Sequence, residues 1–293
     1  MLLGANGQVG RELLRSLAPL GQVIATTRSG RLFDERPCEA LDITDLNALE
    51  AVVCRVAPDV VVNATAHTAV DRAEDESELA FLANAHAPAR LAQVCADIGA
   101  ALVHYSTDYV FDGAGQRPYR EDDATAPLGV YGASKLAGED AIRDSGARHL
   151  ILRTAWVYAL HGHNFLRTML RLGAERDELR VVADQIGSPT PAWLIADVTA
   201  RAIEAGRIEG DTWHLVTSGE VSWHGFAEAI MQTAVESGRL SRAPTVIPIT
   251  TAEFPTRARR PAYSGLDTTR LQNTLGLVLP DWRSALRQTL AIG

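Results

Sequence analysis

The chain has 293 residues, of which 46% are hydrophobic and 22% charged, and its formal net charge is -8 at pH 7. These proportions are ordinary for a globular protein of one large domain or two small ones, and they exclude disordered and fibrous classes. The acidic balance predicts no nucleic-acid partner. Because no apolar run approaches the roughly 20 residues of a membrane helix and the first residues carry no basic leader, we expect a cytoplasmic protein without a membrane partner.

The pattern of the first half of the chain alternates between short apolar runs and helical spacing. The runs that predict buried parallel strands are residues 22–27, 59–66, 101–107 and 149–157. The segments that predict the helices between them are residues 44–56, 77–98 and 129–145. Alternation of this kind is typical of βαβ units, so we expect an α/β protein with a Rossmann-like, doubly wound parallel sheet.

The pattern loosens after residue 157, where stretches with Gly and Pro separate shorter segments. The helices predicted there are residues 164–173, 191–206, 222–238 and 281–291. We therefore divide the chain into a first domain, 1–157, and a smaller C-terminal lobe that takes up most of 158–293. A segment near 190–217 is expected to return to the first domain. The sequence contains no low-complexity linker, so the two parts should pack together.

The stretch "GANGQVG" places Gly4, Gly7 and Gly10 between a strand-like start and a helical pattern. Its GxxGxxG spacing is one residue wider at the front than the dinucleotide fingerprint GxGxxG, and a plain strand-to-helix turn is the alternative. Glycines there permit a tight turn and a close backbone approach to pyrophosphate, whose charge the helix N-terminus stabilises. Only three residues precede the loop, fewer than a usual strand has, which leaves a truncated first strand open.

The second predicted strand ends with Thr27, Arg28 and Ser29 and has no carboxylate there. An Asp or Glu at this position would bind the adenosine ribose hydroxyls and favour NAD. A neutral and basic end tolerates a 2′-phosphate, so the sequence favours NADPH, with NADH as the alternative. The other interpretation is that Arg28 is an ordinary solvated side chain.

Lys135 is the single lysine of a chain whose other 27 Lys or Arg residues are all arginine. It follows Tyr131 by four residues near the start of a predicted helix, so both side chains lie on one face. A nearby ammonium group stabilises a phenolate and lowers the tyrosine pKa towards neutrality, where acid and base catalysis is efficient. A compact ammonium also suits the two hydroxyls of a nicotinamide ribose better than a planar guanidinium does. A chance Tyr-Lys pairing is the alternative.

Ser106 and Thr107 stand at the carboxyl end of the strand 101–107, where open α/β sheets bind their ligands. A threonine there can simply cap a turn. Beside Tyr131 and Lys135, however, Thr107 completes a set of hydroxyl, phenol and ammonium groups that suits the reduction of a carbonyl group. The first domain is therefore predicted to bind NAD(P) and the C-terminal lobe to bind substrate.

The order of GxxGxxG, Ser/Thr and YxxxK resembles the extended short-chain dehydrogenase/reductase superfamily. Finer motifs resemble the dTDP-4-dehydrorhamnose reductase family within it, from Gly4 to nearly the last helix. These motifs are "NATAHTAVDRAE" (63–74), "YSTDYVFDG" (105–113), "APLGVYGASKLAGE" (126–139), "LRTAWVY" (152–158), "DQIGSPT" (184–190) and "ARRP" (258–261). The resemblance implies NAD(P)H-dependent reduction of the C4 ketone of dTDP-4-dehydro-6-deoxy-L-mannose (dTDP-4-dehydrorhamnose) to dTDP-L-rhamnose.

The resemblance also implies roles for individual residues, with Tyr131 as the proton donor. The catalytic set is Thr107, Tyr131 and Lys135. The cofactor set is Gly4, Gly7, Gln8, Val9, Gly10, Thr27, Arg28, Asp42, Ile43, Ala66, His67, Thr68, Tyr105, Tyr131 and Lys135. The substrate set is Thr107, Asp108, Trp156, Arg257, Arg259 and Arg260, in which the arginines would bind the diphosphate and Trp156 the sugar. Trp156 as a core residue is the alternative.

Several other interpretations stay open at this point. The chain could reduce a related dTDP-4-ketosugar, or be a non-catalytic, dinucleotide-binding regulatory subunit like that of methionine adenosyltransferase. A dehydratase is disfavoured because Asp108 is followed by Tyr109 and not by a glutamate. Some family members use Mg²⁺ at a dimer contact. No metal site is predicted from the spacing of this sequence, so Mg²⁺ and a homodimer are left open.

Overall fold

Seven strands form the central sheet in a computed structural model that describes residues 1–292, and all of its pairings are parallel. The strands, in their order across the sheet, are β11 (Asp211–His214), β6 (Arg148–Thr154), β5 (Ala101–Thr107), β4 (Val60–Asn63), β1 (Leu2–Leu3), β2 (Ala25–Thr27) and β3 (Glu39–Ala40). The chain begins near the middle of the sheet and winds outward in both directions. The predicted Rossmann-like, doubly wound fold is confirmed.

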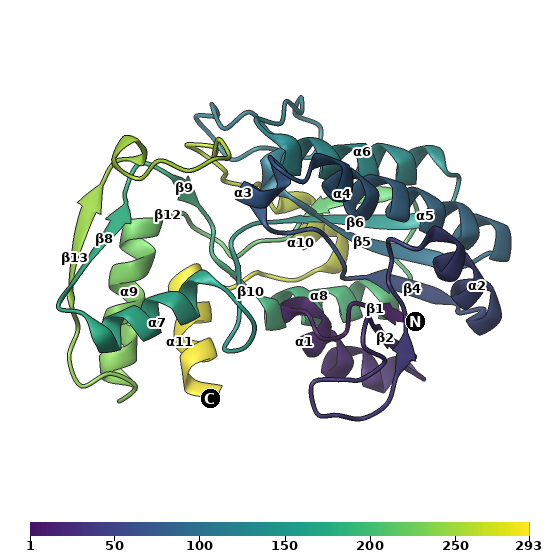
Figure 1. Ribbon diagram of the computed structural model, residues 1–293, viewed down its shortest axis with the longest axis horizontal. Coiled ribbons are helices and arrows are strands. Elements are labelled where there is room, and N and C mark those ends of the chain that lie inside the picture. The colour runs from purple at the N-terminus through teal and green to yellow at the C-terminus, as the bar shows by residue number, and fades with distance from the viewer. Residues whose placement is uncertain (293) are drawn as a thin grey trace.

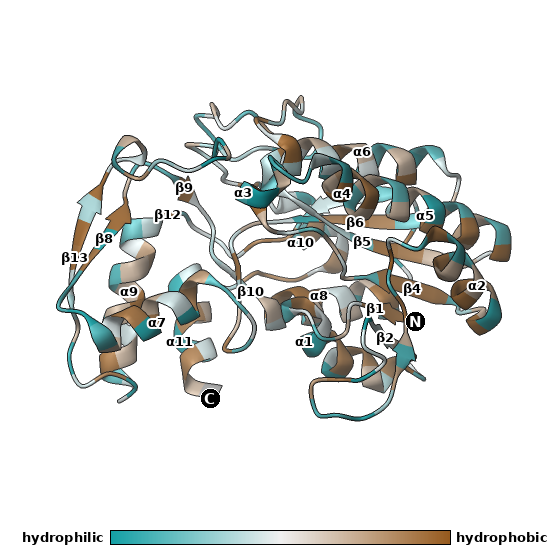
Figure 2. Cartoon of the chain, viewed as in Figure 1, coloured by the Kyte–Doolittle hydropathy of each residue, from teal (hydrophilic) through white to brown (hydrophobic). Residues whose placement is uncertain are grey.

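Helices cover both faces of this sheet (Figure 1). One face carries α1 (Gln8–Leu17) and α8 (Ala192–Glu204), and the other carries α2 (Leu46–Val56), α5 (Ala87–Ile98) and α6 (Val130–Asp144). Successive strand residues point to opposite faces, so Leu102 and Val103 of β5 belong to different hydrophobic cores. Strands buried on both faces are apolar at nearly every position, which explains the uninterrupted runs in the sequence. Figure 2 shows these brown strands between helices of mixed colour.

The helix predicted over residues 77–98 is three segments in the structure. It begins as α4 (Ser77–Phe81), continues as the π-helical segment η2 (Leu82–His86) and ends as α5. The π-helical turn lies against α6, where a Cβ atom added at Gly138 would stand 2.1 Å from the carbonyl oxygen of Asn84. The backbones of the two elements are therefore in direct contact. Apolar periodicity does not distinguish such a turn from an α-helix.

The strand predicted over residues 149–157 ends earlier than expected. β6 stops at Thr154, and β7 (Val157–Tyr158) pairs instead with β10 (Thr190–Pro191). Between them Trp156 has a φ of 48°, in the left-handed region that side chains other than glycine rarely adopt. The chain therefore turns sharply at Trp156 as it leaves the sheet.

The second lobe has its own core beside the sheet. Its helices are α7 (Phe165–Glu175), α9 (Trp223–Glu236) and α11 (Trp282–Ile292), and its parallel strand pair is β8 (Glu178–Val182) and β13 (Thr245–Ile249). Tyr158, Phe226 and Trp282 are among the buried residues of this core. The remaining short elements are β9 (Ile186–Gly187), β12 (Val221–Ser222), α3 (Val70–Ala73), α10 (Thr269–Leu275), η1 (Ala18–Leu20), η3 (Asp108–Val110) and η4 (Thr251–Glu253).

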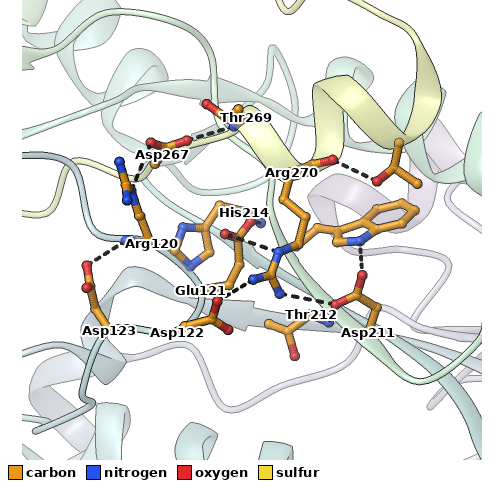
Figure 3. Close-up of polar contacts among 12 residues, drawn as sticks. Arg120, Glu121, Asp122, Asp123, Asp211, Thr212, His214, Asp267, Thr269 and Arg270 are labelled. Atoms are coloured by element: carbon orange, nitrogen blue, oxygen red, sulfur yellow. Dashed lines mark hydrogen bonds and ion pairs between the residues drawn. The ribbon is translucent and has the colours of Figure 1, made fainter.

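Segments from the second half of the chain also belong to the sheet layer, because α8 packs on α1 and β11 pairs with β6. Arg270 of α10 connects β11 to the loop before α6 (Figure 3). Its guanidinium lies 2.6 Å from Asp122, 3.3 Å from Asp211 and 3.7 Å from Glu121. The division at residues 157/158 stays a prediction.

Cys38, Cys54 and Cys95 are free thiols in the structure. Within residues 1–292, no helix combines the length and the apolar character needed to cross a bilayer.

Replacing Gly138 by alanine tests the direct contact between α6 and η2. Helix propensity alone would stabilise the protein by about 1 kcal/mol. Because the new methyl group would lie 2.1 Å from the Asn84 carbonyl oxygen, we expect overpacking to win and to lower the free energy of unfolding by about 1–3 kcal/mol. Denaturant unfolding measures the difference. A variant more stable than the wild type would contradict the contact.

Candidate active site

The three predicted catalytic residues meet at the carboxyl end of β5. Thr107 is the last residue of β5, and Tyr131 and Lys135 occupy the first two turns of α6. The phenol of Tyr131 lies beside Thr107 and Asp108. The amine of Lys135 is buried and donates to the carbonyl oxygen of Tyr105 at 2.6 Å. The structure thus brings hydroxyl, phenol and amine to the edge of the sheet where α/β proteins bind their ligands.

Burial dominates the proton affinities of this site. It raises the pKa of Tyr131 to about 12, against a hydrogen bond with Thr107 that lowers it. It lowers the pKa of Lys135 to about 8, partly offset by the carboxylate of Glu139 one turn further along α6. The lowered pKa of Tyr131 predicted from its spacing to Lys135 does not hold in this structure. The reason is that the half-buried phenol lies beside Asp108, while the amine of Lys135 is engaged by β5.

Thr107 and Asp108 form a buried hydrogen-bonded pair. The hydroxyl of Thr107 donates to Asp108 Oδ1 at 2.9 Å and accepts from the amide of Tyr109 at 3.2 Å. Asp108 Oδ2 is buried and has no hydrogen-bond partner in the described part of the chain. Burial raises the pKa of Asp108 to about 6, although the hydrogen bond from Thr107 acts against the rise.

The glycine loop has the geometry of an anion site. A Cβ atom added at Gly10 would lie 2.1 Å from the carbonyl oxygen of Gly4, so the start of α1 packs against the loop backbone. No side chain caps this helix at Gly7. The amides of its first turn, which include Gln8 and Val9, therefore have no acceptor within the helix and remain available to phosphate oxygens.

The second lobe reaches this loop through residues 161–164. The side-chain amide of Asn164 donates to Gln8 Oε1 at 2.7 Å, and His161 Nε2 lies 3.1 Å from the carbonyl oxygen of Gln8. The sequence motifs did not indicate this contact between the glycine loop and the second lobe. It places Gln8 at the junction of the two parts.

Thr27 and Arg28 lie at the carboxyl end of β2, as predicted, but only Arg28 is free to reach a ligand. The hydroxyl of Thr27 accepts the amide of Arg31 at 3.1 Å and is buried within this turn. Arg28 is exposed, and the turn presents a second exposed cation, Arg31, which the sequence analysis did not select. Thr27 therefore shapes the turn that carries both cations.

Asp42 and Ile43 lie beyond the next edge strand. Asp42 accepts hydrogen bonds from the amide and the hydroxyl of Thr44, and these, with a smaller effect of Arg28, lower its pKa. Ile43 is half-buried against the core under α2. The two residues form the turn that leads into α2, on the same side of the sheet as Arg28.

His67 is held in the loop after β4 by a buried asparagine. Asn84 of η2 accepts the amide of His67 at 2.8 Å and donates to its carbonyl oxygen at 3.1 Å. The ring Nε2 of His67 lies 3.0 Å from Glu76, and Nδ1 is buried without a partner in the described chain. Ala66 and Thr68 flank it with exposed side chains. Sequence analysis missed Asn84, whose only signal is a polar residue within an apolar helical pattern.

Tyr105, one of the predicted cofactor residues, directs its phenol towards α8. Its phenol lies 2.8 Å from the hydroxyl of Thr199 on α8, and burial raises its pKa. His104 and Tyr105 are successive residues of β5, so their side chains project to opposite faces of the sheet. His104 faces Lys135, and Tyr105 contributes its carbonyl oxygen rather than its phenol.

Trp156 stacks on Trp223 of α9, with ring centroids 3.5 Å apart and planes 5° from parallel. The ring lies over Gly187, where an added Cβ atom would stand 2.6 Å from the indole. The left-handed backbone at Trp156 and the missing side chain at Gly187 together orient the indole. Trp156 therefore joins the two lobes; it is half-buried and packs against the small core that contains Phe111 and Tyr119.

The predicted diphosphate arginines lie opposite an acidic segment, residues 71–76. Arg260 forms a two-pronged ion pair with Asp71, at 3.1 and 2.7 Å, and Arg257 pairs with Asp75. Arg259 is exposed. From the same segment Glu74 accepts the amide of Val130 at 2.9 Å, at the first residue of the helix that carries Tyr131. Within residues 1–292, no group of three or more His, Cys, Asp or Glu side chains is arranged to hold a metal ion.

Comparison with known proteins gives consistent similarities. The family model described as the RmlD substrate binding domain matches residues 1–292. A dTDP-4-dehydrorhamnose reductase of Escherichia coli K12 is 45% identical over 99% of this chain and 96% of its own. The crystal structure of a dTDP-4-dehydrorhamnose reductase from Bacillus anthracis in complex with NADP is 35% identical, with a TM-score of 0.90 over 100% of this chain and 98% of that one. A dTDP-4-dehydrorhamnose reductase structure from Clostridium acetobutylicum is 37% identical, with a TM-score of 0.90 over 99% and 98%.

The raised pKa of Asp108 predicts a pH-dependent gain from Asp108→Asn. A carboxyl whose pKa is raised by folding contributes stability below its unfolded pKa of 3.8, and this contribution is lost as the pH rises through about 6. At pH 8 the amide removes the cost of a buried charge, so we expect the variant to gain roughly 1–3 kcal/mol relative to its effect near pH 4.

Urea unfolding of the wild type and the variant at both pH values measures this difference. Asp144→Asn, on the exposed last turn of α6, is the matched control and should show no such dependence. An equal effect of Asp108→Asn at both pH values would show that folding does not raise the pKa of this carboxyl.

Proposed function

The chain belongs to the dTDP-4-dehydrorhamnose reductase family, and from this premise we propose its reaction. The RmlD substrate binding domain model and relatives at 45% identity cover nearly its whole length. It is an oxidoreductase of the extended short-chain dehydrogenase/reductase type. We propose that it reduces the C4 ketone of dTDP-4-dehydrorhamnose to the alcohol of dTDP-L-rhamnose. The observation that carries this proposal is the meeting of Thr107, Tyr131 and Lys135 at one edge of the sheet.

Tyr131 is proposed as the proton donor to the oxygen of the ketone as it becomes an alcohol. A pKa of about 12 makes the phenol a weak acid. It is nevertheless much more acidic than the alcohol that forms, so the transfer runs downhill. Thr107 would donate to the same oxygen from the end of β5, next to the phenol. To do so its hydroxyl turns from Asp108, to which it donates at 2.9 Å.

The residues present fit a dinucleotide, which would supply the hydride when it is bound. The absence of a side chain at Gly10 lets α1 start close to the loop backbone, and the uncapped first turn of α1 offers free amides to a pyrophosphate. We propose NADPH, because Arg28 and Arg31 are exposed cations at the end of β2 and that turn carries no carboxylate in its place. The Bacillus anthracis relative was crystallised with NADP.

The substrate is proposed to lie between the lobes. Arg257, Arg259 and Arg260 would bind the diphosphate, because a guanidinium matches phosphate oxygens with paired hydrogen bonds. The oriented indole of Trp156 would pack on the sugar. In this proposal the first domain, with α8 and β11, binds the cofactor, and most of the second lobe binds the sugar nucleotide.

The assay that tests the function mixes the protein with NADPH and dTDP-4-dehydrorhamnose and follows the absorbance of the reduced nicotinamide. Tyr131→Phe should retain NADPH binding and lose about 10²–10⁴-fold in kcat, because the proton donor is removed while the pocket stays. NADPH binding is measured separately by fluorescence titration. NMR of the product identifies the sugar and its configuration at C4.

Each outcome of this assay has one meaning. No oxidation of NADPH by the wild type would refute the enzyme and favour a dinucleotide-binding regulatory protein. Turnover of another dTDP-4-ketosugar with no turnover of dTDP-4-dehydrorhamnose would refute the proposed substrate. A near-normal kcat for Tyr131→Phe would refute the role of Tyr131 alone.

A further inference from the structure

Behind Lys135 lies a buried chain of hydrogen bonds that the proposed reaction does not use. Asn63 at the end of β4, His104 in β5 and Lys135 in α6 are each at most 2% exposed. The side-chain amide of Asn63 lies 3.1 Å from His104 Nδ1, and His104 Nε2 lies 3.1 Å from Lys135 Nζ. Polar groups this deeply buried must satisfy one another, so the direction of each hydrogen bond carries information.

The direction is fixed at the Asn63 end of the chain. The backbone amide of Thr65 lies 3.1 Å from Asn63 Oδ1, and the Thr65 hydroxyl donates to the same atom. Because a backbone N–H can only donate, the atom that faces it must be the amide oxygen. The NH2 group of Asn63 therefore faces His104, whose Nδ1 must accept.

Accepting at Nδ1 places the single ring proton of His104 on Nε2. Burial, with the neighbouring lysine, lowers the pKa of His104 well below its usual value, so the ring stays neutral and carries only one proton. The Nε2–H bond then points at Lys135 Nζ. An ammonium group has donors only, whereas a neutral amine accepts through its lone pair. The amine keeps its own hydrogen bond to the Tyr105 carbonyl oxygen.

We propose that His104 is a positioning residue that presents a ring N–H to the amine of Lys135 and so stabilises the form of this lysine that has lost its proton. The purpose of this arrangement rests on the proposed function: it would let Lys135 exchange a proton next to Tyr131 instead of remaining a permanent cation. His104 acts through Lys135, because His104 itself is fully buried on the far side of the amine.

The charged groups around this pair come from the neighbouring elements and do not replace His104. Glu139 on α6 favours the ammonium form of Lys135. Its carboxylate is already held by Arg153 of β6, at 2.9 and 2.7 Å, and by Arg143. On β5 the phenol of Tyr105 faces α8, so only its carbonyl oxygen reaches the amine. Among these neighbours of Lys135, His104 is thus the one whose hydrogen-bond direction disfavours the ammonium form.

The solitary lysine makes the test unusually direct. Protein grown with lysine labelled with ¹³C at Cε gives one side-chain signal, from Lys135, whose shift reports the state of the amine as the pH is raised. The wild type should titrate with a pKa of about 8. His104→Gln can turn an amide oxygen towards the amine, so it should raise this pKa by about one unit, a tenfold shift in proton affinity.

Two further variants separate the hydrogen bond from burial. His104→Asn can keep an acceptor for Asn63 but leaves no donor in front of Lys135, so it should raise the pKa by less, in the same direction. His149→Asn removes another buried imidazole of the sheet, one whose Nδ1 contacts the carbonyl oxygen of Ala147, and should leave the titration unchanged. A pKa in His104→Gln equal to or below that of the wild type overturns the proposal.

A measurement on the wild type alone guards against a variant that does not fold. The ¹⁵N spectrum of the histidine rings, with the His104 signals assigned by their loss in His104→Asn or by through-bond correlation, should show a proton on Nε2 and none on Nδ1. A proton on Nδ1 overturns the proposal. Both measurements use neither substrate nor NADPH, so they can fail while the enzyme reduces the sugar, and they can succeed if it does not.

Discussion

The backbone of α6 touches its neighbours directly at two glycines, and the positions of Tyr131 and Lys135 depend on this close approach. A Cβ atom at Gly132 would lie 2.2 Å from the carbonyl oxygen of Tyr109, and one at Gly138 would lie 2.1 Å from that of Asn84. With the helix this close, a lysine side chain reaches the Tyr105 carbonyl oxygen and is fully buried. A guanidinium there would be wider and would keep its charge at any working pH. A chain that otherwise uses arginine therefore has a physical reason for lysine at this position.

The acidic segment, residues 71–76, connects α6 to the loop that carries Arg257 and Arg260. Glu74 binds the first amide of α6, while Asp71 and Asp75 hold Arg260 and Arg257 from the other lobe. One short stretch after β4 therefore sets the start of the helix that carries Tyr131. It also sets the position of the arginines that are proposed to bind the diphosphate. Because a guanidinium has five N–H donors, Arg260 can pair with Asp71 and still bind a phosphate oxygen. The ion pairs thus orient the cations without using all their hydrogen bonds.

The periodicity of the sequence was sufficient for β2, β4, β5 and β6 and for most helices, because strands buried on two faces and helices buried on one differ in apolar spacing. It did not indicate the edge strands β3 and β11. It failed where the backbone departs from regular geometry. The π-helical turn at Asn84 has a helical pattern, and the left-handed residue Trp156 lies inside an apolar run. The motifs placed Tyr131, Lys135 and Thr107 together, but they carry no information on orientation. Tyr105 faces α8, and the role of His104 depends on partners 41 and 31 residues away.

Burial, more than any single partner, sets the charge of this site. It moves the pKa of Asp108 up to about 6 and that of Lys135 down to about 8, so the pKa values of these two groups approach neutrality from opposite sides. Between these values the site holds one carboxylate and one ammonium, and their charges cancel. Below about pH 6 Asp108 takes up a proton and is no longer a charged acceptor for the Thr107 hydroxyl. Above about pH 8 Lys135 loses its proton. The depth at which the fold buries these two side chains therefore sets the pH range in which both are charged.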